Sequence, residues 1–551
     1  MRYLGSLLLI LCVCVPAIAQ HQTAHSATKP ATLMSGISDL HHPVTTTNPE
    51  AQKFFDQGLR LIYAFNHDEA ARSFQRAADL DPKMAMAYWG IAEAVGPNYN
   101  DPASDERFQQ AHEAIEKASS LSSGASVTER DYIEAMAKRF PVQGADRRKA
   151  AEDYRDAMRE VMNKYPDDLD AATLFAESGM NLHPWGLWMK DGTPREGTEE
   201  IVSTLESVIK RDPNHLGAVH YYIHAVEASP SPERALAGAN RLAALAPAAG
   251  HIVHMPAHVY IRTGDYDEAV KVNERAAAAD EAYIKTSAAN GVHPAMYSGM
   301  YYSHNLHFIA IAASMKGNFT EAKQAADKLS AHVQPMLKDM PMLEGFTVIP
   351  TAVLVRFEKW NDVLKIPQPD ANLKIATTFW HYARGMALAG TGKPDEAEKE
   401  HSAIVAVKEA TPDDAVYAPP FNNKTKDILQ IADDVLAAKI ALARKDTEAA
   451  ISHYRNAVAV QDKLNYGEPP DWYFPVRESL GGALLKANKT ADAEKVFRED
   501  LQQNPRNPRS LFGLCEALKL QGRDYDAQFV EKQYRGYWDG HGLELKVENL
   551  I

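Results

Sequence analysis

From residue 51 onward, the chain alternates amphipathic segments in pairs. In the stretch AQKFFDQGLRLIYAFNHDEAARSFQRAADLDP, apolar residues recur three and four positions apart, which is the spacing of one helix face. Gly58 lies within the first segment, Ala70, Phe74 and Ala77 mark the second, and Pro82 ends it. Small residues let paired helices approach closely, and the aromatic side chain fills the space between them. The pattern predicts helix–turn–helix units in an all-α fold.

The pattern recurs with a regular period. Units anchored on the small–aromatic–small triplet of the second helix begin near residues 51, 85, 216, 250, 303, 344, 378, 431, 474 and 508. Four intervals, 51 to 85, 216 to 250, 344 to 378 and 474 to 508, are 34 residues long. The period and the segment GDYDEAVKVNERAAAAD at 264–280 resemble the tetratricopeptide repeat (TPR). This resemblance implies a right-handed α-solenoid, in which stacked units bury the face that a single unit leaves exposed.

Two breaks in the period flank the histidine-rich part of the chain. Residues 185–197 carry Pro and Gly, and residues 281–299 lengthen one interval from 34 to 53 residues. We expect both to be inserted loops. Loops of this length in a compact array are often functional, although variable connectors are the plain alternative.

The sequence divides into five regions. Arg2, the apolar run LGSLLLILCVCV and the small residues at 17–19 have the layout of a secretory signal peptide over residues 1–19. Residues 20–50 form a predicted polar linker, followed by N-terminal helical repeats at 51–214, histidine-rich repeats at 215–343 and C-terminal TPR units at 344–551. We therefore expect an exported protein, periplasmic or secreted.

Charge and cysteine content narrow the classes of partner and site. A net charge of -14 argues against a nucleic-acid partner, because phosphate binding needs a basic surface. After the leader, no apolar stretch is long enough to predict a membrane span. Cys12 and Cys14 belong to the signal peptide, which leaves Cys515 alone in the mature chain. An intramolecular disulfide is therefore excluded, and any metal must be held by His, Asp or Glu.

Histidines are dense between residues 215 and 307, in HLGAVHYYIH, HIVHMPAH and SHNLHF. Residues three and four apart share one helix face. The TPR resemblance further implies that the second, fifth and ninth residues of each unit point into the concave groove. For the units at 216, 250 and 303, these positions are Gly217, His220, His224, His251, His254, His258, His304, His307 and Ile311. Seven of the nine are histidine, although histidine was not used to set the register.

Two carboxylates border the same predicted groove. Aligning Leu169 with Leu216 places Glu177 at the ninth position of its unit, beside His224. Glu227 follows His224 by three residues, at the twelfth position. We expect Glu177 and Glu227 to act as metal ligands or as partners that orient the imidazoles.

Nitrogen-rich ligation predicts a transition-metal cofactor, namely copper, iron or zinc, as one or two ions. An all-histidine copper pair is one possibility. A carboxylate ligand would favour iron or zinc, and His220, His224 and Glu177 would make a 2-His-1-carboxylate iron site. The motifs HExxH, CxxCH and GxSxG are absent from the sequence, so zincin, c-type haem and serine-hydrolase interpretations are not supported.

Two functional interpretations follow. In the first, the protein is a metal-dependent enzyme, an oxidoreductase or hydrolase, with a small-molecule substrate in the concave groove. In the second, it is a protein–protein interaction scaffold that holds a protein or peptide partner in that groove, with a structural metal or no metal. The resemblance to a repeat family brings no catalytic residues with it.

Overall fold

The computed structural model describes residues 29–142, 144–417, 423–540 and 544–551. The predicted signal peptide lies outside these ranges. Helices up to residue 263 are α1 (Pro49–Ile62), α2 (His67–Leu80), α3 (Ala85–Val95), α4 (Asp105–Leu121), α5 (Val127–Arg139), α6 (Arg147–Lys164), α7 (Leu169–Met180), α8 (Thr198–Arg211), α9 (Leu216–Val226), α10 (Leu236–Leu245), α11 (Gly250–His254) and α12 (Pro256–Thr263).

The later helices are α13 (Tyr266–Ala289), α14 (Ala295–Tyr297), α15 (Ser303–Lys316), α16 (Phe319–Val333), α17 (Ile349–Arg356), α18 (Trp360–Val363), α19 (Lys374–Gly390), α20 (Pro394–Ala410), α21 (Thr425–Ala443), α22 (Thr447–Gln461), α23 (Val476–Lys486), α24 (Thr490–Gln503), α25 (Pro508–Leu520) and α26 (Asp524–Tyr537). Short turns are η1 (Ser122–Gly124), η2 (Pro232–Ala235), η3 (Ser298–Tyr302), η4 (Gln334–Met336), η5 (Pro341–Val348) and η6 (Val547–Leu550). Within the described ranges, β-structure is limited to isolated bridges. The predicted all-α fold is confirmed.

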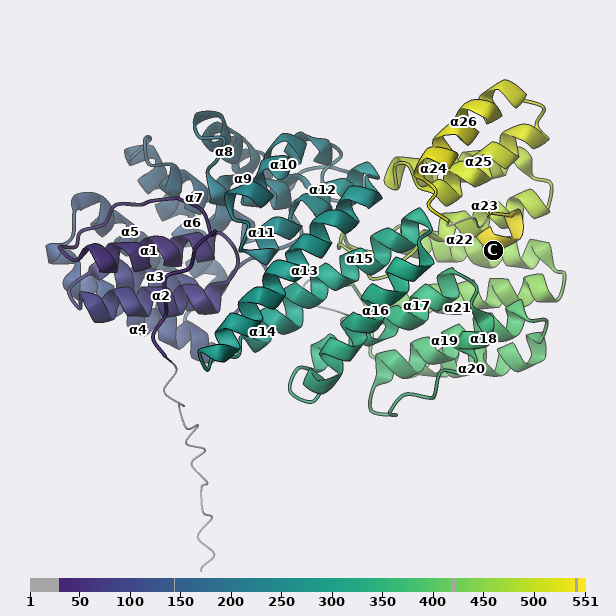
Figure 1. Ribbon diagram of the computed structural model, residues 1–551, viewed down its shortest axis with the longest axis horizontal. Helices are drawn as coiled ribbons and strands as arrows, with labels where there is room; N and C mark the ends of the chain where they lie inside the picture. Colours follow the sequence, from purple (N-terminus) through teal and green to yellow (C-terminus); the bar gives the residue numbers. More distant parts are fainter. Residues whose placement is uncertain (1–28, 143, 418–422, 541–543) are drawn as a thin grey trace, which may run out of the picture.

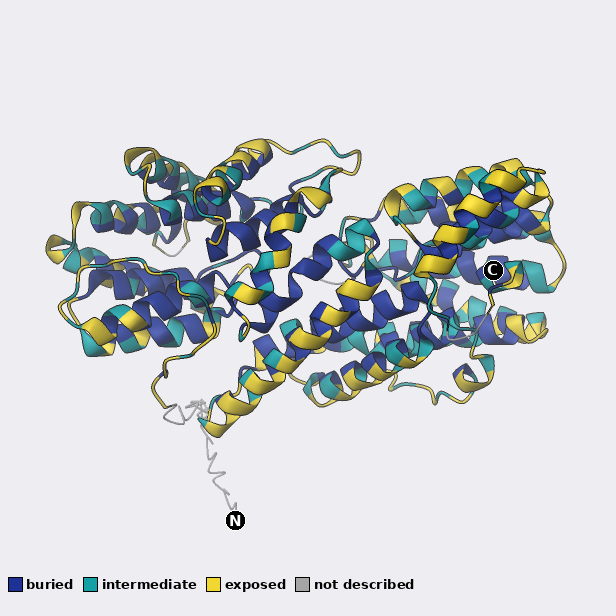
Figure 2. Cartoon of the chain, turned by 45° about the horizontal axis from the view of Figure 1, so that its top comes forward, coloured by how far each residue is buried: buried dark blue, intermediate teal, exposed yellow. Residues whose placement is uncertain are grey.

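The helices pair as the repeat pattern predicts. Consecutive helices such as α1 and α2, α15 and α16, and α21 and α22 pack against each other along the chain. Figure 1 shows these pairs stacked into an elongated α-solenoid, from the purple N-terminal units to the yellow C-terminal units. In Figure 2 the buried residues line the faces between helices, and the exposed residues lie on the outer faces. No described helix is both long and apolar enough to cross a bilayer.

Glycine positions explain how closely the units stack. The Phe74 ring of α2 packs so near α1 and α3 that a Cβ at Gly58 or Gly90 would lie 2.6 or 2.4 Å from it. In the C-terminal half, Phe497 of α24 meets Gly481 and Gly513 in the same way, at 2.3 and 2.1 Å. At each end of the array, therefore, one phenylalanine packs against its own unit and the next: Phe74 in the N-terminal units and Phe497 in the C-terminal units.

The described part of the predicted linker, residues 29–48, has no regular secondary structure, yet it packs on the repeats. Ile37 is buried, and the Gly36 carbonyl accepts a hydrogen bond from the Ala248 amide at 2.9 Å. His42 Nδ1 bonds Asp170 Oδ2 at 2.7 Å, and the Thr45 amide donates to Glu129 at 2.6 Å. These polar residues are held by buried carboxylates of α5 and α7, so the segment is a strap across the N-terminal units.

One predicted insertion is helical. Over 281–289 the loop prediction is wrong, because α13 continues for 24 residues to Ala289. The sequence RAAAADEAYIKTSAA contains neither Gly nor Pro and is rich in helix formers, so nothing ends the helix earlier. Asn290 and Gly291 follow it, and η3, a five-residue π-helix, leads directly into α15. Single π-turns of this kind are frequent beside functional sites.

Candidate metal centre

The predicted groove histidines come from first helices of neighbouring units. His220 and His224 lie on α9, His251 and His254 on α11, His258 on α12, and His304 on α15. A helix break separates α11 from α12, because Pro256 has no N–H to continue the backbone hydrogen bonds. The His258 amide instead bonds the Met255 carbonyl at 3.2 Å.

Six of the seven predicted histidines form two adjacent trios. The first trio is His220, His224 and His251, and the second trio is His254, His258 and His304. Within each trio, one nitrogen per imidazole lies within 4.8 Å of the other two. Ring centroids are 4.9 to 6.1 Å apart in the first trio and 4.7 to 5.7 Å apart in the second. The two trios touch, with centroid distances of 5.8 Å for His251 to His254 and 5.5 Å for His224 to His258.

Hydrogen bonds at Nδ1 fix how two of the rings are turned. His220 Nδ1 lies 2.6 Å from the Tyr63 carbonyl oxygen, which can only accept a hydrogen bond. His254 Nδ1 lies 2.7 Å from Asn273 Oδ1, and the Asn273 amide group donates to the Ala269 carbonyl at 2.7 Å. Both imidazoles therefore carry their proton on Nδ1, which leaves the Nε2 lone pair for a metal.

Within each trio, Nε2 atoms of different imidazoles point toward one another. His220 Nε2 lies 3.1 Å from His251 Nε2, and His254 Nε2 lies 2.8 Å from His258 Nε2. His224 Nε2 is buried and has no hydrogen-bond partner. Two nitrogen ligands at about 2.0–2.1 Å from one tetrahedral ion stand roughly 3.3 Å apart. The observed spacing needs only a small expansion to admit an ion, which would take the place of the contact between the two imidazoles in each pair.

A single carboxylate connects the two trios. Glu227 Oε1 accepts from His224 Nδ1 at 3.0 Å, and Glu227 Oε2 is 2.6 Å from His258 Nδ1. Glu227 and both imidazoles are buried. The sequence prediction placed Glu227 beside the site either as a ligand or as an orienting group, and its contacts with Nδ1 atoms correspond to the orienting role.

A second carboxylate at the site escaped the sequence analysis. Glu468, in the loop between α22 and α23, is buried and places Oε2 at 3.6 Å from His258 Nδ1. Burial raises the pKa of Glu468, and the charge of Glu227 raises it further. About 210 residues separate His258 from Glu468 along the chain, so no local spacing could have revealed this neighbour.

Burial keeps most of the cluster neutral. It lowers the pKa of His220, His251, His254 and His304 well below the usual histidine value, and the neighbouring imidazoles lower it further. For His258, burial acts in the same direction, but the charges of Glu227 and Glu468 raise its pKa overall. Neutral imidazole is the form that binds metals.

Aromatic side chains close the site. The Phe65 ring contacts all three rings of the first trio at 4.5 to 5.6 Å, and Phe308 contacts all three of the second at 4.6 to 5.0 Å. Trp185, from the predicted insertion at 185–197, packs on His224 at 5.6 Å. Only His304 among the six is partly exposed. The histidines thus lie in an enclosed centre rather than along an open concave groove, because chain segments far away in the sequence fill that groove.

Two predicted site residues lie outside the trios. His307 packs between Phe346 and Tyr473, each with ring centroids at 5.6 Å, and burial lowers its pKa to about 3. Glu177 hydrogen-bonds Asn181 and lies 3.9 Å from Arg139. The 2-His-1-carboxylate arrangement considered above is therefore not formed: the buried Arg139 guanidinium, rather than a metal, faces this carboxylate.

A family model described as tetratricopeptide repeat matches residues 257–282, which cover most of α12 and the first part of α13. This segment belongs to the helical array described above. The chain is a TPR-type repeat protein.

Other comparisons give limited similarity. A 55-residue segment, 10% of this TPR chain, is 40% identical to an uncharacterized protein of Aquifex aeolicus (strain VF5) and spans 7% of that protein's length. A human IFIT1 dimer with m7Gppp-AAAA is 13% identical over 90% of this chain and 91% of the other, with a TM-score of 0.35. Naa15/Naa10 bound to HypK-THB is 12% identical over 92% of this chain and 91% of the other, with a TM-score of 0.26. These structures provide no argument about function.

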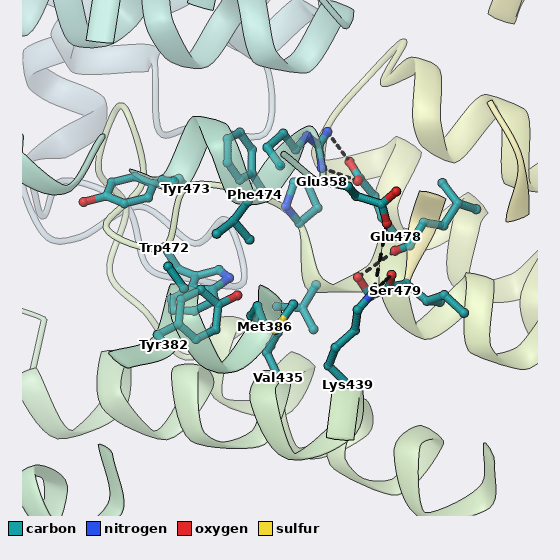
Figure 3. A pocket seen from close by; sticks show the side chains of 18 of the residues that line it. Glu358, Tyr382, Met386, Val435, Lys439, Trp472, Tyr473, Phe474, Glu478 and Ser479 are labelled. Atoms are coloured by element: carbon teal, nitrogen blue, oxygen red, sulfur yellow. Dashed lines mark hydrogen bonds and ion pairs between the residues drawn. The ribbon is translucent and has the colours of Figure 1, made fainter. Parts of the chain in front are cut away.

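The C-terminal TPR units enclose a different site. A cavity of about 110 Å³ lies among α17, α19, α21, α23 and α25. Figure 3 shows Tyr382, Trp472 and Phe474 as its aromatic walls, with Lys439 and Glu478 at one side. Lys439 donates to the Ile551 carbonyl oxygen, so residues 549–551 form part of the wall.

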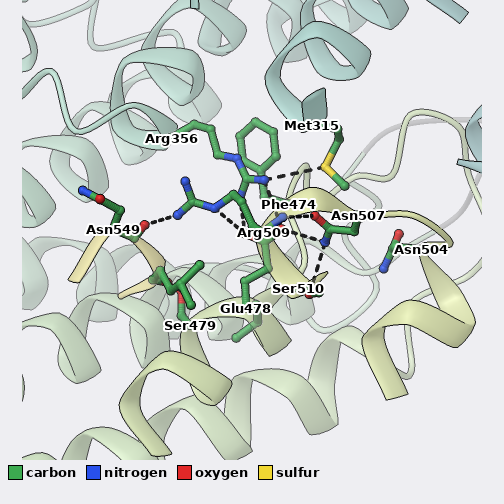
Figure 4. A network of polar contacts seen from close by, with 12 residues as sticks. Met315, Arg356, Phe474, Glu478, Ser479, Asn504, Asn507, Arg509, Ser510 and Asn549 are labelled. Atoms are coloured by element: carbon green, nitrogen blue, oxygen red, sulfur yellow. Dashed lines mark hydrogen bonds and ion pairs between the residues drawn. The ribbon is translucent and has the colours of Figure 1, made fainter. Parts of the chain in front are cut away.

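A buried ion-pair network supports that cavity. Arg356 and Arg509 both donate to the Glu478 carboxylate, and Asn507 Nδ2 donates to Glu478 Oε1 at 2.8 Å (Figure 4). Arg509 also donates to the Asn549 carbonyl oxygen. Burial acts to raise the pKa of Glu478, but the two guanidinium groups hold it below the usual value. In this half of the TPR array, the principal charges pair with one another.

Proposed function

We propose that this TPR protein is a dinuclear transition-metal protein, with one ion held by the first trio and one by the second. One observation supports the dinuclear site most strongly: the Nε2 atoms of the histidines converge, and contacts at Nδ1 hold the rings in that orientation. Buried polar atoms are normally partnered, and an ion in the first trio would partner His224 Nε2, which has no hydrogen-bond partner. Three ligands per ion leave a coordination position free, as in catalytic rather than structural sites. An enzymatic role, oxidoreductase or hydrolase, on a small molecule is therefore favoured.

The donor set narrows the choice of metal. Each trio offers imidazole nitrogen only, Glu227 and Glu468 approach the second trio at His258, and Glu177 lies outside both trios beside Asn181. Imidazole ligation suits copper, zinc and iron, but iron in open sites commonly adds a carboxylate. Copper or zinc is therefore favoured over iron. The proposed setting is an exported protein, periplasmic or secreted.

The metal proposal is tested by elemental analysis after metal-free purification and reloading with copper, zinc or iron. We expect two ions per chain in the wild type. His254→Ala and His258→Ala should each lose the ion of the second trio, whereas His215→Ala and His453→Ala should retain both. His215 bonds Asp170 and His453 contacts Asp434, away from the trios. No bound metal in the wild type, or equal losses in all four variants, would contradict the proposal.

A second candidate function is protein interaction on the repeat scaffold. Tyr525 and Phe529, four residues apart on the final helix α26, are 85% and 66% exposed. Large exposed aromatic side chains on one helix face are typical of protein-binding surfaces. The partner would then be a protein or peptide, and the net charge of -14 keeps nucleic acid outside the proposal. Loss of a co-purifying protein in a Tyr525→Ser, Phe529→Ser variant with unchanged metal content would support it.

A further inference from the structure

The space between the trios has a defined chemistry. His251 and His254 belong to different trios but to one helix, and His224 and His258 face each other across the boundary, with ring centroids at 5.8 and 5.5 Å. Two ions held by these trios would be near neighbours. Each would have three protein ligands and a free position, so one small molecule could bind both.

The ligands favour copper for such a pair. Six neutral imidazoles supply no negative charge to the ions, which suits copper in its singly charged reduced form. For divalent ions, nitrogen sites bind copper most tightly of the first-row metals. Glu227 contacts the trios through Nδ1 of His224 and His258, so the closest carboxylate balances charge from outside the ligand set.

The walls restrict what can enter. Phe65 lies against the first trio and Phe308 against the second, and the histidines are buried except for partial exposure at His304. Apolar walls of this kind disfavour a charged substrate. We therefore expect any bound molecule to be small, uncharged and soluble in an apolar interior.

We propose that the paired trios hold two copper ions and that dioxygen binds between them. This inference rests on the proposed dinuclear function. Each copper(I) gives one electron, so both become copper(II), and the dioxygen accepts the two electrons. Its bond order falls from two to one, and an oxygen–copper bond forms to each ion. No proton or leaving group takes part, and release of dioxygen returns both electrons to the copper ions.

The test uses the full chain, loaded with copper(I) under anaerobic conditions and then titrated with dioxygen. We expect uptake of one dioxygen for every two coppers, no paramagnetic signal from isolated copper(II), and release of dioxygen under vacuum. His251→Ala and His304→Ala each remove one ligand from one trio and should abolish this uptake while one ion remains. Lys495→Met, on the exposed face of α24, is the control and should behave as the wild type.

The outcomes separate the two proposals. Two bound coppers without dioxygen uptake, or with the signal of two isolated copper(II) ions, would overturn the dioxygen inference and leave the metal centre standing. Failure to bind copper, zinc or iron would overturn the proposed function itself. If His251→Ala fails to fold, His304→Ala provides the same comparison from the partly exposed side of the site.

Discussion

The two halves of the solenoid use the same register positions for different chemistry. In the N-terminal half, the second, fifth and ninth residues of the units at 216, 250 and 303 supply the histidines of both trios. In the C-terminal half, the same positions of the units at 378, 431, 474 and 508 supply lining residues of the other cavity, namely Phe379, Tyr382, Met386, Val435, Lys439, Pro475, Glu478 and Arg509. A single backbone arrangement therefore presents nitrogen ligands in one half and aromatic and charged groups in the other.

The difference shows how a ligand site can be told from a structural one. In the C-terminal half, Glu478 accepts hydrogen bonds from two guanidinium groups and an amide, so its charge is balanced within the protein. In the N-terminal half, His224 Nε2 is buried among imidazoles without a hydrogen-bond partner. The fold is common to both halves, and a buried imidazole nitrogen without a partner, beside two other imidazoles, indicates where an external group is needed.

Removing the charge balance of the C-terminal half should give the largest effect. Glu478→Ala leaves Arg356 and Arg509 facing each other in a buried site, so we expect a loss of about 3–5 kcal/mol in the free energy of unfolding. Chemical denaturation measures this, with the exposed Glu448→Ala as control. If the halves are independent, the folded variant still binds two metal ions. Loss of metal from the folded variant would show that the two sites are coupled.

Removing the carboxylate shared by the trios should have an intermediate effect. Glu227→Gln keeps the side-chain shape but withdraws the negative charge beside His224 and His258 Nδ1. Loss of such an orienting partner typically weakens metal affinity about 10- to 100-fold, and here we expect both ions to be affected. Competition titrations with a chelator provide the measurement.

Asn273→Ala is the matched comparison, because His254 is the histidine of the trios that Asn273 hydrogen-bonds. It should weaken binding at the second trio alone, while Glu233→Gln on the surface should leave both affinities unchanged. Equal losses at both trios in Asn273→Ala would contradict the assignment of separate ions.

The last prediction is a pH-dependent effect on the strap over residues 29–48. Asp170 raises the pKa of His42 to about 9 from 6.5, although burial opposes the rise. The contact between protonated His42 and Asp170 stabilises the folded state. Because the pKa of His42 is higher in the folded state than in the unfolded state, this stabilisation is complete below pH 6.5 and is lost as the pH rises through 9. It amounts to about 3 kcal/mol at most.

Hydrogen exchange of the strap amides provides the measurement. Protection in the wild type should fall between pH 6.5 and 9 relative to His42→Gln, once the intrinsic pH dependence of exchange is removed. His453→Gln, far from the strap, is the control. An identical pH profile in His42→Gln would show that the Asp170 contact does not hold the strap.

The sequence predicted the helical repeats and most of the histidine positions, because both follow from local periodicity. It could not predict Phe65, Tyr63 or Glu468 at the site, since these come from units that meet it only after the chain folds. Glu177 has the expected register, but the long-range contact with Arg139 directs its carboxylate elsewhere. Likewise, periodicity alone could not show that distant segments enclose the groove.

Because Glu468 contacts the histidine centre, that centre is built from both halves of the chain. The histidines come from residues 220–304, while Glu468 reaches them from the loop that precedes α23. Contacts from both halves would slow the release of an ion bound there, so its residence time would depend on how often those contacts open. Metal retention would then report on the integrity of the solenoid: a nick or a weakened contact far from the histidines would appear first as faster exchange of the ion.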